Sequence, residues 1–348
     1  MTSTTRPAAT LSAADYFHQL LAYAAFTAGA THRFQVGDVP IDLTANTPEL
    51  AARLLRPLSH LHQTTDAPRI RIRLVSADRE PPPFPWPDAG ELGGLREWAD
   101  GGYRFSQYGG VAVVGFEVGT GRAVGYVRVP EQLPAAFFSG LLFTTIYQGL
   151  RAFDYFLLHA AALSWQGAGV LITGPSGAGK TTTMLQCVRA GFQFVADDAT
   201  LLHLQSDGQV RAVSTLNTMH VTRQTSALFP ELAVPVQDQR GDKTTLFLPE
   251  IYPQAMASSA MVRLLLVPSL HGPRDGSLEP LSARAVLADA LPLSVDLSQP
   301  EAATAHLDLL FHLVSTVRSY HLHLPPEIGA APELIKAAIQ RHAENSAA

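Results

Sequence analysis

Cysteine is almost absent from this sequence of 348 residues, which contains only Cys187. A single cysteine excludes an internal disulfide, so we expect a reducing compartment and a buried thiol inside a helix. Long runs of basic residues are also missing, and the formal net charge is −5. Nucleic acid is therefore excluded as the main partner, because binding it needs a basic footprint.

The sequence also lacks a long, purely apolar segment. Residues 1–12 are polar, contain no signal-peptide core and are predicted to be a flexible N-terminus. Residues 132–150 carry no charge, but proline, serine, threonine and glutamine dilute their hydrophobicity and Arg151 follows. We therefore expect a buried helix there, no membrane partner and a cytoplasmic protein.

The length and the local patterns predict two domains. Helical spacing is seen in residues 13–28 and after Thr47-Pro48-Glu49, and Glu80 to Pro87 form a proline-rich loop. Strand patterns occupy residues 33–43, 69–74, 103–107, 110–117 and 122–129, the last three separated by glycine turns. These features predict an α+β domain over residues 13–152.

The second half, residues 153–348, predicts an α/β domain with a mixed sheet. A strand over residues 168–173 leads into a glycine loop and a helix over residues 181–189, which Gly191 ends. Further strands are expected at residues 193–196, 199–204, 209–214, 261–267 and 319–324, with helices at residues 282–291, 301–317 and 332–343. Ser206-Asp207-Gly208 indicates a hairpin turn.

A phosphate-binding motif carries the chemistry of this domain. It fits G-x-x-x-x-G-K-[ST] between the predicted strand and helix and reads Gly174-Pro175-Ser176-Gly177-Ala178-Gly179-Lys180-Thr181. Its glycines let backbone N–H groups turn toward an anion, and the helix adds the positive end of its dipole. Lys180 would meet the β and γ phosphates of ATP, the Thr181 hydroxyl would bind Mg²⁺, and Thr182 would complete the nucleotide site.

A competing motif overlaps this loop. Gly174 to Ala178 resemble the serine turn of α/β-hydrolases, but the following Gly179-Lys180-Thr181 fits a phosphate loop much better.

Asp197-Asp198 end the next strand, and adjacent strand residues face opposite ways, so we expect the two aspartates to differ in role. One would accept a proton from an attacking hydroxyl and the other would hold the metal or its waters.

His159, this loop and the acidic pair together resemble the catalytic domain of HPr kinase/phosphorylase and related kinases. That family has a histidine about fifteen residues before the loop and an Asp-Asp pair after its helix, on a fold akin to phosphoenolpyruvate carboxykinase. The resemblance implies that Asp197 is the general base, that His159 orients or tunes it, and that Asp198 serves Mg²⁺. A one-residue error in register would exchange the two aspartates.

The family's second signature, a Glu-x-Arg-Gly-like run, is not found here. Arg240-Gly241-Asp242-Lys243 is the nearest polar cluster, and either a phosphate-closing role for Arg240 or Lys243 or a plain surface loop fits it. The N-terminal half matches no motif of the HPr-directed enzymes. We therefore expect an acceptor other than HPr, with the first domain selecting it.

The leading hypothesis is an ATP-dependent kinase that phosphorylates a serine-type hydroxyl of a protein, peptide or small molecule. The alternative is a nucleotide-binding sensor or scaffold without transfer. A dedicated transition-metal site at His321-x-His323 is not favoured, because no cysteine or well-placed carboxylate accompanies the pair. A homo-oligomer is compatible with the sequence, which does not fix the oligomeric state, the acceptor or the preferred nucleotide.

Overall fold

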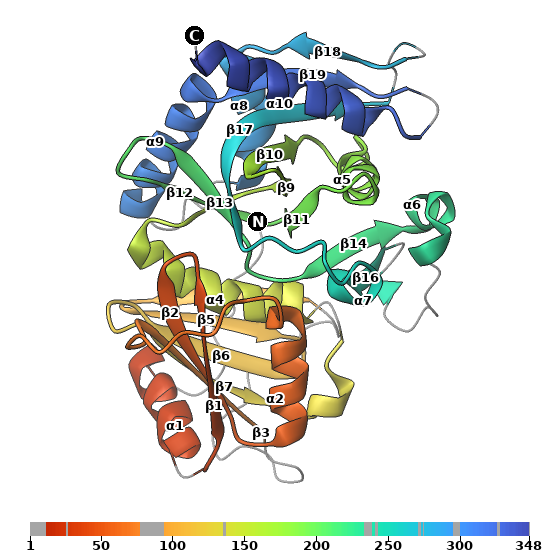
Figure 1. The fold of residues 1–348 in the computed structure, drawn as a ribbon. Helices are drawn as coiled ribbons and strands as arrows, with labels where there is room; N and C mark the ends of the chain where they lie inside the picture. The colour runs from red at the N-terminus through yellow and green to blue at the C-terminus, as the bar shows by residue number, and fades with distance from the viewer. Residues whose placement is uncertain are drawn as a thin grey trace, which may run out of the picture. The chain divides into compact units, whose positions relative to one another are not determined.

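The computed structural model describes residues 12–25, 27–76, 94–134, 137–232, 239–240, 243–270, 273, 275–294, 300–325 and 328–347. Contacts divide the chain into two compact units, Met1–Phe153 and Asp154–Ala348 (Figure 1). The predicted loop at Glu80 to Pro87 lies outside the described residues, as do residues 1–11 of the N-terminus that is predicted to be flexible over residues 1–12.

Unit 1 contains a seven-stranded sheet with helices on both faces. Its helices are α1 (Ala13–Ala25), α2 (Pro48–Leu55), η1 (Arg56–Leu58), η2 (Pro130–Gln132), η3 (Phe138–Leu142), α4 (Phe143–Leu150) and η4 (Arg151–Phe153). Its strands are β1 (Ala30–Val36), β2 (Val39–Ala45), β3 (Ile70–Ser76), β4 (Leu95–Asp100), β5 (Tyr103–Tyr108), β6 (Ala112–Glu117) and β7 (Arg122–Val127), in the order β1-β2-β3-β7-β6-β5-β4.

The single strand predicted over residues 33–43 is wrong. The structure has a hairpin there, in which β1 and β2 pair antiparallel with Val36 opposite Val39. The turn is made by Gly37, whose φ of 60° suits glycine, and Asp38. Glycine followed by aspartate is a hairpin signal, and the alternation that continues on both sides of it concealed the turn.

The two faces of the unit 1 sheet carry different helices. Phe17 of α1 packs on Gly115 of β6, where an added Cβ would lie 2.9 Å from the Phe17 ring, so only glycine fits. On the opposite face, Gly149 of α4 lies against Ile70 of β3. The helix predicted in residues 132–150 is thus a buried helix, and no described helix is long and apolar enough to cross a membrane.

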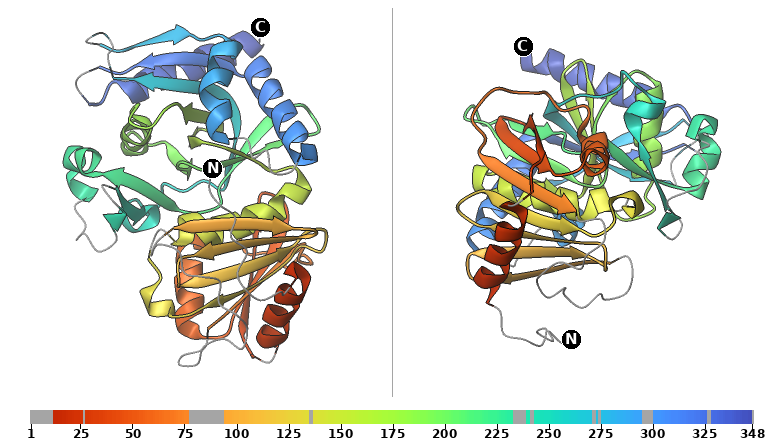
Figure 2. Two further views of the ribbon diagram at one scale, coloured as in Figure 1. Left: turned by 180° about the vertical axis from the view of Figure 1, so that it is seen from behind. Right: turned by 90° about the horizontal axis from the view of Figure 1, so that it is seen from below.

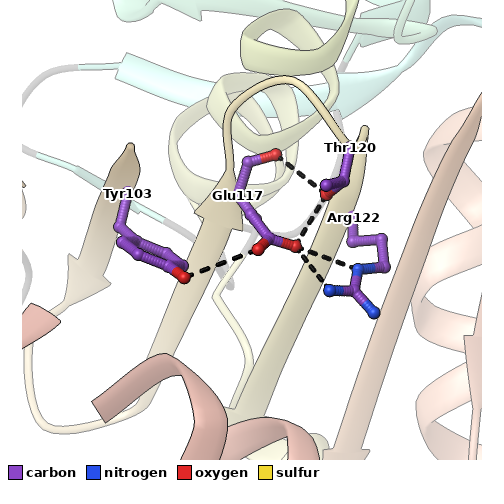
Figure 3. Close-up of polar contacts among 4 residues, drawn as sticks. All are labelled: Tyr103, Glu117, Thr120 and Arg122. Atoms are coloured by element: carbon purple, nitrogen blue, oxygen red, sulfur yellow. Dashed lines mark hydrogen bonds and ion pairs between the residues drawn. The ribbon is translucent and has the colours of Figure 1, made fainter. Parts of the chain in front are cut away.

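A polar cluster joins β5, β6 and β7 of this sheet (Figure 3). Glu117 accepts hydrogen bonds from the Arg122 guanidinium at 2.6 and 3.0 Å, from Thr120 at 2.8 Å and from Tyr103 at 3.4 Å. These donors hold the pKa of Glu117 below its usual value although its burial acts in the opposite direction. The structure contains the predicted three-stranded meander, and the cluster links its three strands.

Unit 2 is built on a nine-stranded mixed sheet and a small three-stranded sheet (Figure 1). Its strands are β8 (Phe156–Leu158), β9 (Ala160–Trp165), β10 (Ala168–Thr173), β11 (Gln193–Ala196), β12 (Thr200–Leu204), β13 (Val210–Val213), β14 (Thr218–Thr222), β15 (Gln239–Arg240), β16 (Lys243–Phe247), β17 (Ser259–Ser269), β18 (Ser277–Pro280) and β19 (Arg318–His323). Its helices are α5 (Lys180–Arg189), α6 (Arg223–Leu228), η5 (Pro230–Leu232), α7 (Leu248–Ile251), α8 (Ala283–Ser294), α9 (Pro300–Thr316) and α10 (Ala331–Ala347). The predicted α/β class is confirmed.

The strand directions in unit 2 bring several strand ends to one edge. The large sheet has the order β11-β9-β10-β17-β13-β12-β8, with β19 pairing to β17 and β18. β10, β17 and β19 run parallel, and β9 runs antiparallel to both β10 and β11. The carboxyl ends of β10, β11, β17 and β19 therefore meet at the same edge, together with the residue that precedes β9.

Two hydrophobic cores cover the two faces of this sheet (Figure 2 shows the unit from two further sides). One core joins the sheet to α5 and α10 through Met184, Leu185, Ile335 and Ile339, and buries Cys187 completely, as predicted. The other joins it to α8 and α9 through Val286, Leu309, Leu310 and Leu313. Because hydrophobic side chains are buried on both faces, the sheet is rigid, and the ends of its strands hold the loops that follow them in fixed positions.

Candidate functional site

The predicted phosphate loop lies between β10 and α5, as the motif requires. Gly174, Gly177 and Gly179 have φ angles of 134°, 84° and 100°, a region that glycine adopts without strain. Nothing lies within 4 Å of a Cβ added at Gly177, so the loop is open to its surroundings there. This backbone matches the open, glycine-dependent turn that can present N–H groups to an anion.

Lys180 starts α5 and turns back over the loop. Its ammonium group donates hydrogen bonds to the carbonyls of Gly174 at 2.8 Å and Pro175 at 3.2 Å, and the residue is only 7% exposed. Burial lowers the pKa of Lys180, and the charges of Asp198 and Asp197 act against that shift. The side chain is thus a cation held over the loop, where phosphate oxygens could replace the two carbonyls.

The two aspartates occupy different environments directly after β11. Asp197 is 8% exposed, and its Oδ2 accepts a hydrogen bond from the backbone N–H of His220 at 2.9 Å. Its Oδ1 is buried and has no hydrogen-bond partner among the described residues. Burial, together with the charge of Asp198, raises the pKa of Asp197 to about 7, although the His220 N–H, Lys243 and Lys180 oppose the shift.

Asp198 is half-buried and has a φ of 59°, which is unusual for a residue other than glycine. Its Oδ2 lies 3.7 Å from the ammonium nitrogen of Lys243, at the start of β16. The chain therefore makes a sharp turn at this position and separates the two carboxylates. One is buried with a spare oxygen, and the other is paired with a lysine near the surface.

His159 lies in the bend between β8 and β9, and the register places it beyond the Thr173–Ala160 pair. Its backbone is held on both sides, because its N–H donates to Ser294 at 3.0 Å and its carbonyl accepts from Thr173 at 3.0 Å. Burial lowers the pKa of the His159 imidazole. The charge of Asp198 and a hydrogen bond with the backbone of Asp198 act in the opposite direction. His159 is thus in electrostatic contact with Asp198 and Lys180.

Threonines surround the start of α5. Thr181 and Thr182 are half-buried, and the Thr182 hydroxyl lies 3.4 Å from that of Thr225 on α6. Thr222 caps the N-terminus of α6 by accepting from the Thr225 N–H at 3.1 Å. The small sheet and α6 therefore form one wall of the site.

The structure brings the predicted site residues to one edge of the unit 2 sheet. Ser176 and Ala178 lie in the loop beside the glycines, and both aspartates act electrostatically on Lys180. Sequence reasoning missed the His220 backbone and Thr225, since no local pattern indicates that β14 and α6 return to the loop. Of the Arg240–Lys243 cluster, Lys243 reaches Asp198, whereas Gly241, Asp242 and the Arg240 side chain lie outside the described part of the chain.

The histidine pair on β19 is arranged differently. The His321 and His323 rings lie 4.5 Å apart, and His323 contacts Ser269 and Glu279, each at 3.2 Å. Within the described residues, no group of three or more histidine, cysteine or acidic side chains could hold a metal ion.

The residues of the loop edge fit Mg²⁺-bound ATP. The glycine loop and Lys180 would hold the phosphates. Oδ1 of Asp197, which has no hydrogen-bond partner among the described residues, could accept a hydrogen bond from a bound ligand. Mg²⁺ bound to phosphates needs only one or two protein ligands, and the Thr181 hydroxyl and Asp198 are of the type it prefers. Bound in this way, the ion would neutralise negative charge on the phosphates.

Among the comparisons with known proteins, the matches to curated proteins agree with the resemblance that the sequence motifs carry. A family model described as SynChlorMet cassette protein ScmC matches residues 138–241. The chain is 41% identical over 56 residues to an HPr kinase/phosphorylase from Clostridium beijerinckii, covering 16% of this chain and 18% of that protein. It is 51% identical over 41 residues to an HPr kinase/phosphorylase from Limosilactobacillus reuteri, covering 12% of this chain and 13% of that protein.

These matches span less than a fifth of the length of either curated relative. Among solved structures, the HPr(Ser) kinase/phosphatase from Coxiella burnetii aligns with a TM-score of 0.31 at 16% identity, over 55% of this chain and 92% of that one. The sequence matches, rather than this loose superposition, support the relationship. The chain is similar to the HPr kinase/phosphorylases, as its motifs predicted.

Proposed function

We propose that this relative of the HPr kinase/phosphorylases is an ATP-dependent kinase that phosphorylates a hydroxyl group of a protein, peptide or small molecule. The observation that carries the proposal is Asp197. Burying this carboxylate to 8% exposure, with one oxygen lacking a partner among the described residues, costs free energy of folding. Such a cost is expected where the group has a function at the site. A protein that only binds a nucleotide has no need of such a base.

The pKa of Asp197 suits a general base. A base works best when its pKa lies near the working pH, and burial raises that of Asp197 to about 7. Oδ2 is fixed by the His220 N–H, so Oδ1 is the oxygen that would accept the proton of the acceptor hydroxyl. As that proton moves to Oδ1, the hydroxyl oxygen attacks the γ phosphorus and the bond to the leaving ADP oxygen breaks.

The remaining groups divide the charge of the substrates between them. Lys180 would exchange its contacts with the Gly174 and Pro175 carbonyls for phosphate oxygens. Asp198 and Thr181 would hold Mg²⁺, and Lys243 would leave Asp198 to approach the phosphates. His159, in contact with the backbone of Asp198, would keep the acidic turn in place.

Replacing Asp197 by asparagine tests the proposal. Asp197→Asn keeps an acceptor for the His220 N–H but removes the base, so ATP affinity should change less than about threefold. Transfer should fall by about a hundredfold or more. Binding would be measured by calorimetry, and transfer by incubation with labelled ATP and a cell extract as the source of acceptors.

Two matched variants accompany this experiment. Asp207→Asn changes an exposed hairpin aspartate and should leave both binding and transfer intact. Lys180→Ala should lose both, because the loop then lacks its cation. ATP binding without any transferred label in the wild-type protein would favour a nucleotide sensor, and unchanged transfer in Asp197→Asn would remove the role of the base.

A further inference from the structure

The end of β17 runs along the phosphate loop. A Cβ added at Gly174 would lie 3.5 Å from a methyl group of Val267 and 3.9 Å from the Pro268 ring. At the other end of the loop, a Cβ added at Gly179 would lie 3.3 Å from a methyl group of Leu270 and 2.9 Å from one of Leu324. The two leucines therefore flank the last loop glycine, which directly precedes Lys180.

These two leucines differ in exposure. Leu324, the first residue after β19, is 4% exposed and belongs to the core under α5. Leu270, the first residue after β17, is 56% exposed. A single exposed leucine is ordinary on a protein surface, so its position beside the loop is what gives it meaning.

The order of the strands assigns a direction to a nucleotide in this loop. Asp197 and Asp198 follow β11 and His159 precedes β9, on one side of β10, whereas Leu270 and Leu324 follow β17 and β19 on the other side. The γ phosphate must meet the acids, because they act on the phosphoryl group and its acceptor. The opposite end of the nucleotide, with its sugar and base, must then leave the loop toward the leucines.

We propose that Leu270, supported from below by Leu324, is the surface on which the base of the donor nucleotide packs. The inference rests on the proposed function, since it assumes that the loop holds a nucleoside triphosphate. An aliphatic side chain contacts the face of a purine ring and carries no hydrogen-bonding group. Leu270 therefore strengthens the binding of ATP and GTP alike and contributes nothing to the binding of inorganic tripolyphosphate.

The experiment compares these three ligands in the full-length protein. Affinities of the Mg²⁺ complexes of ATP, GTP and tripolyphosphate would be measured by calorimetry for the wild type and for Leu270→Ala. We expect Leu270→Ala to weaken ATP and GTP by about three- to tenfold each and to leave tripolyphosphate unchanged. Leu270→Met, which keeps an apolar surface, should retain most of the nucleotide affinity.

Leu204→Ala is the matched control. Leu204 is 39% exposed and is the last residue of β12, at the end of the strand away from the acidic turn. Its replacement by alanine should therefore alter none of the three affinities. Thermal unfolding would establish that each variant is folded. An equal loss for all three ligands in Leu270→Ala, or no loss for the two nucleotides, would overturn the inference.

The outcome separates this inference from the proposed function. If the wild-type protein binds ATP through Leu270 but transfers no phosphate, the base-packing surface is supported and the kinase proposal is refuted. If the wild-type protein transfers phosphate and Leu270→Ala binds the nucleotides as tightly as the wild type, the kinase proposal is supported and the base-packing surface is refuted. A protein that binds none of the three ligands loses both.

Discussion

At the scale of single residues, Asp197 and Asp198 show how neighbours of identical chemistry acquire different properties. The turn at Asp198, with its positive φ, leaves Asp197 buried under the backbone of β14 and directs Asp198 to Lys243. Burial then raises the pKa of Asp197. Position in the fold, rather than residue type, separates the proposed base from the proposed metal ligand.

The raised pKa of Asp197 predicts how transfer depends on pH. The base must lose its proton, so kcat/KM, which reports the free protein, should rise by about tenfold between pH 6 and pH 8, with a midpoint near 7. In Asp197→Asn the residual rate should lack this rise. A pH–rate profile of both proteins measures it, and a wild-type rate that is flat over this interval would contradict the assignment.

The same shift has a consequence for stability. Between the ordinary aspartate pKa of 3.8 and about 7, folded Asp197 keeps a proton that the unfolded chain has already lost. The free energy of unfolding should therefore decrease as the pH rises through that window. Asp197→Asn should lose less stability than the wild type between pH 5 and pH 8, which denaturant titration at the two values would measure.

At the scale of elements, the junction between the loop and α5 depends on glycine for two separate reasons. Gly179 has a φ of 100°, and its added Cβ would approach Leu324 to 2.9 Å. Gly167, in the turn between β9 and β10, has a φ of 84° but nothing within 4 Å. The first position carries a backbone and a steric cost for any side chain, and the second only a backbone cost.

Alanine substitutions at these two glycines should therefore differ. Gly167→Ala should lower the free energy of unfolding by about 1 kcal/mol, and Gly179→Ala by about 2–4 kcal/mol together with loss of nucleotide binding. Chemical denaturation and ATP titration would compare them. Equal effects in the two variants would show that Leu324 yields to the added methyl group.

Several elements could be predicted from local patterns. Thr47 caps α2 through its hydroxyl, Gly191 ends α5 with a φ of 92°, and β10 and β11 have the predicted bounds. Strand β4 was missed, because its side chains are almost all exposed and show no alternation. The sequence pattern predicts one strand where β1 and β2 form a hairpin, because the apolar alternation continues across the turn.

At the scale of the whole molecule, the two units have separate hydrophobic cores, and every proposed site residue belongs to Asp154–Ala348. Mg²⁺-bound ATP should therefore slow hydrogen exchange of the backbone amides in residues 174–182 and around Asp197. The strands of unit 1 should exchange as before. Mass spectrometry of peptides with and without ATP tests this prediction, with Lys180→Ala as the protein that should show no protection.

The sequence by itself determined the glycine loop with its phosphate-binding motif, the acidic pair, the α/β class of the second half and the likeness to HPr kinase/phosphorylases. Each of these depends on residues close together in the chain, where spacing and propensity specify geometry. The tertiary structure decided which groups join them. β9 lies between β10 and β11 and reverses direction, β16 returns Lys243 to Asp198, and β17 carries Leu270 to the loop. Such pairings are made between distant segments by burial of the sheet faces, and no local pattern records them.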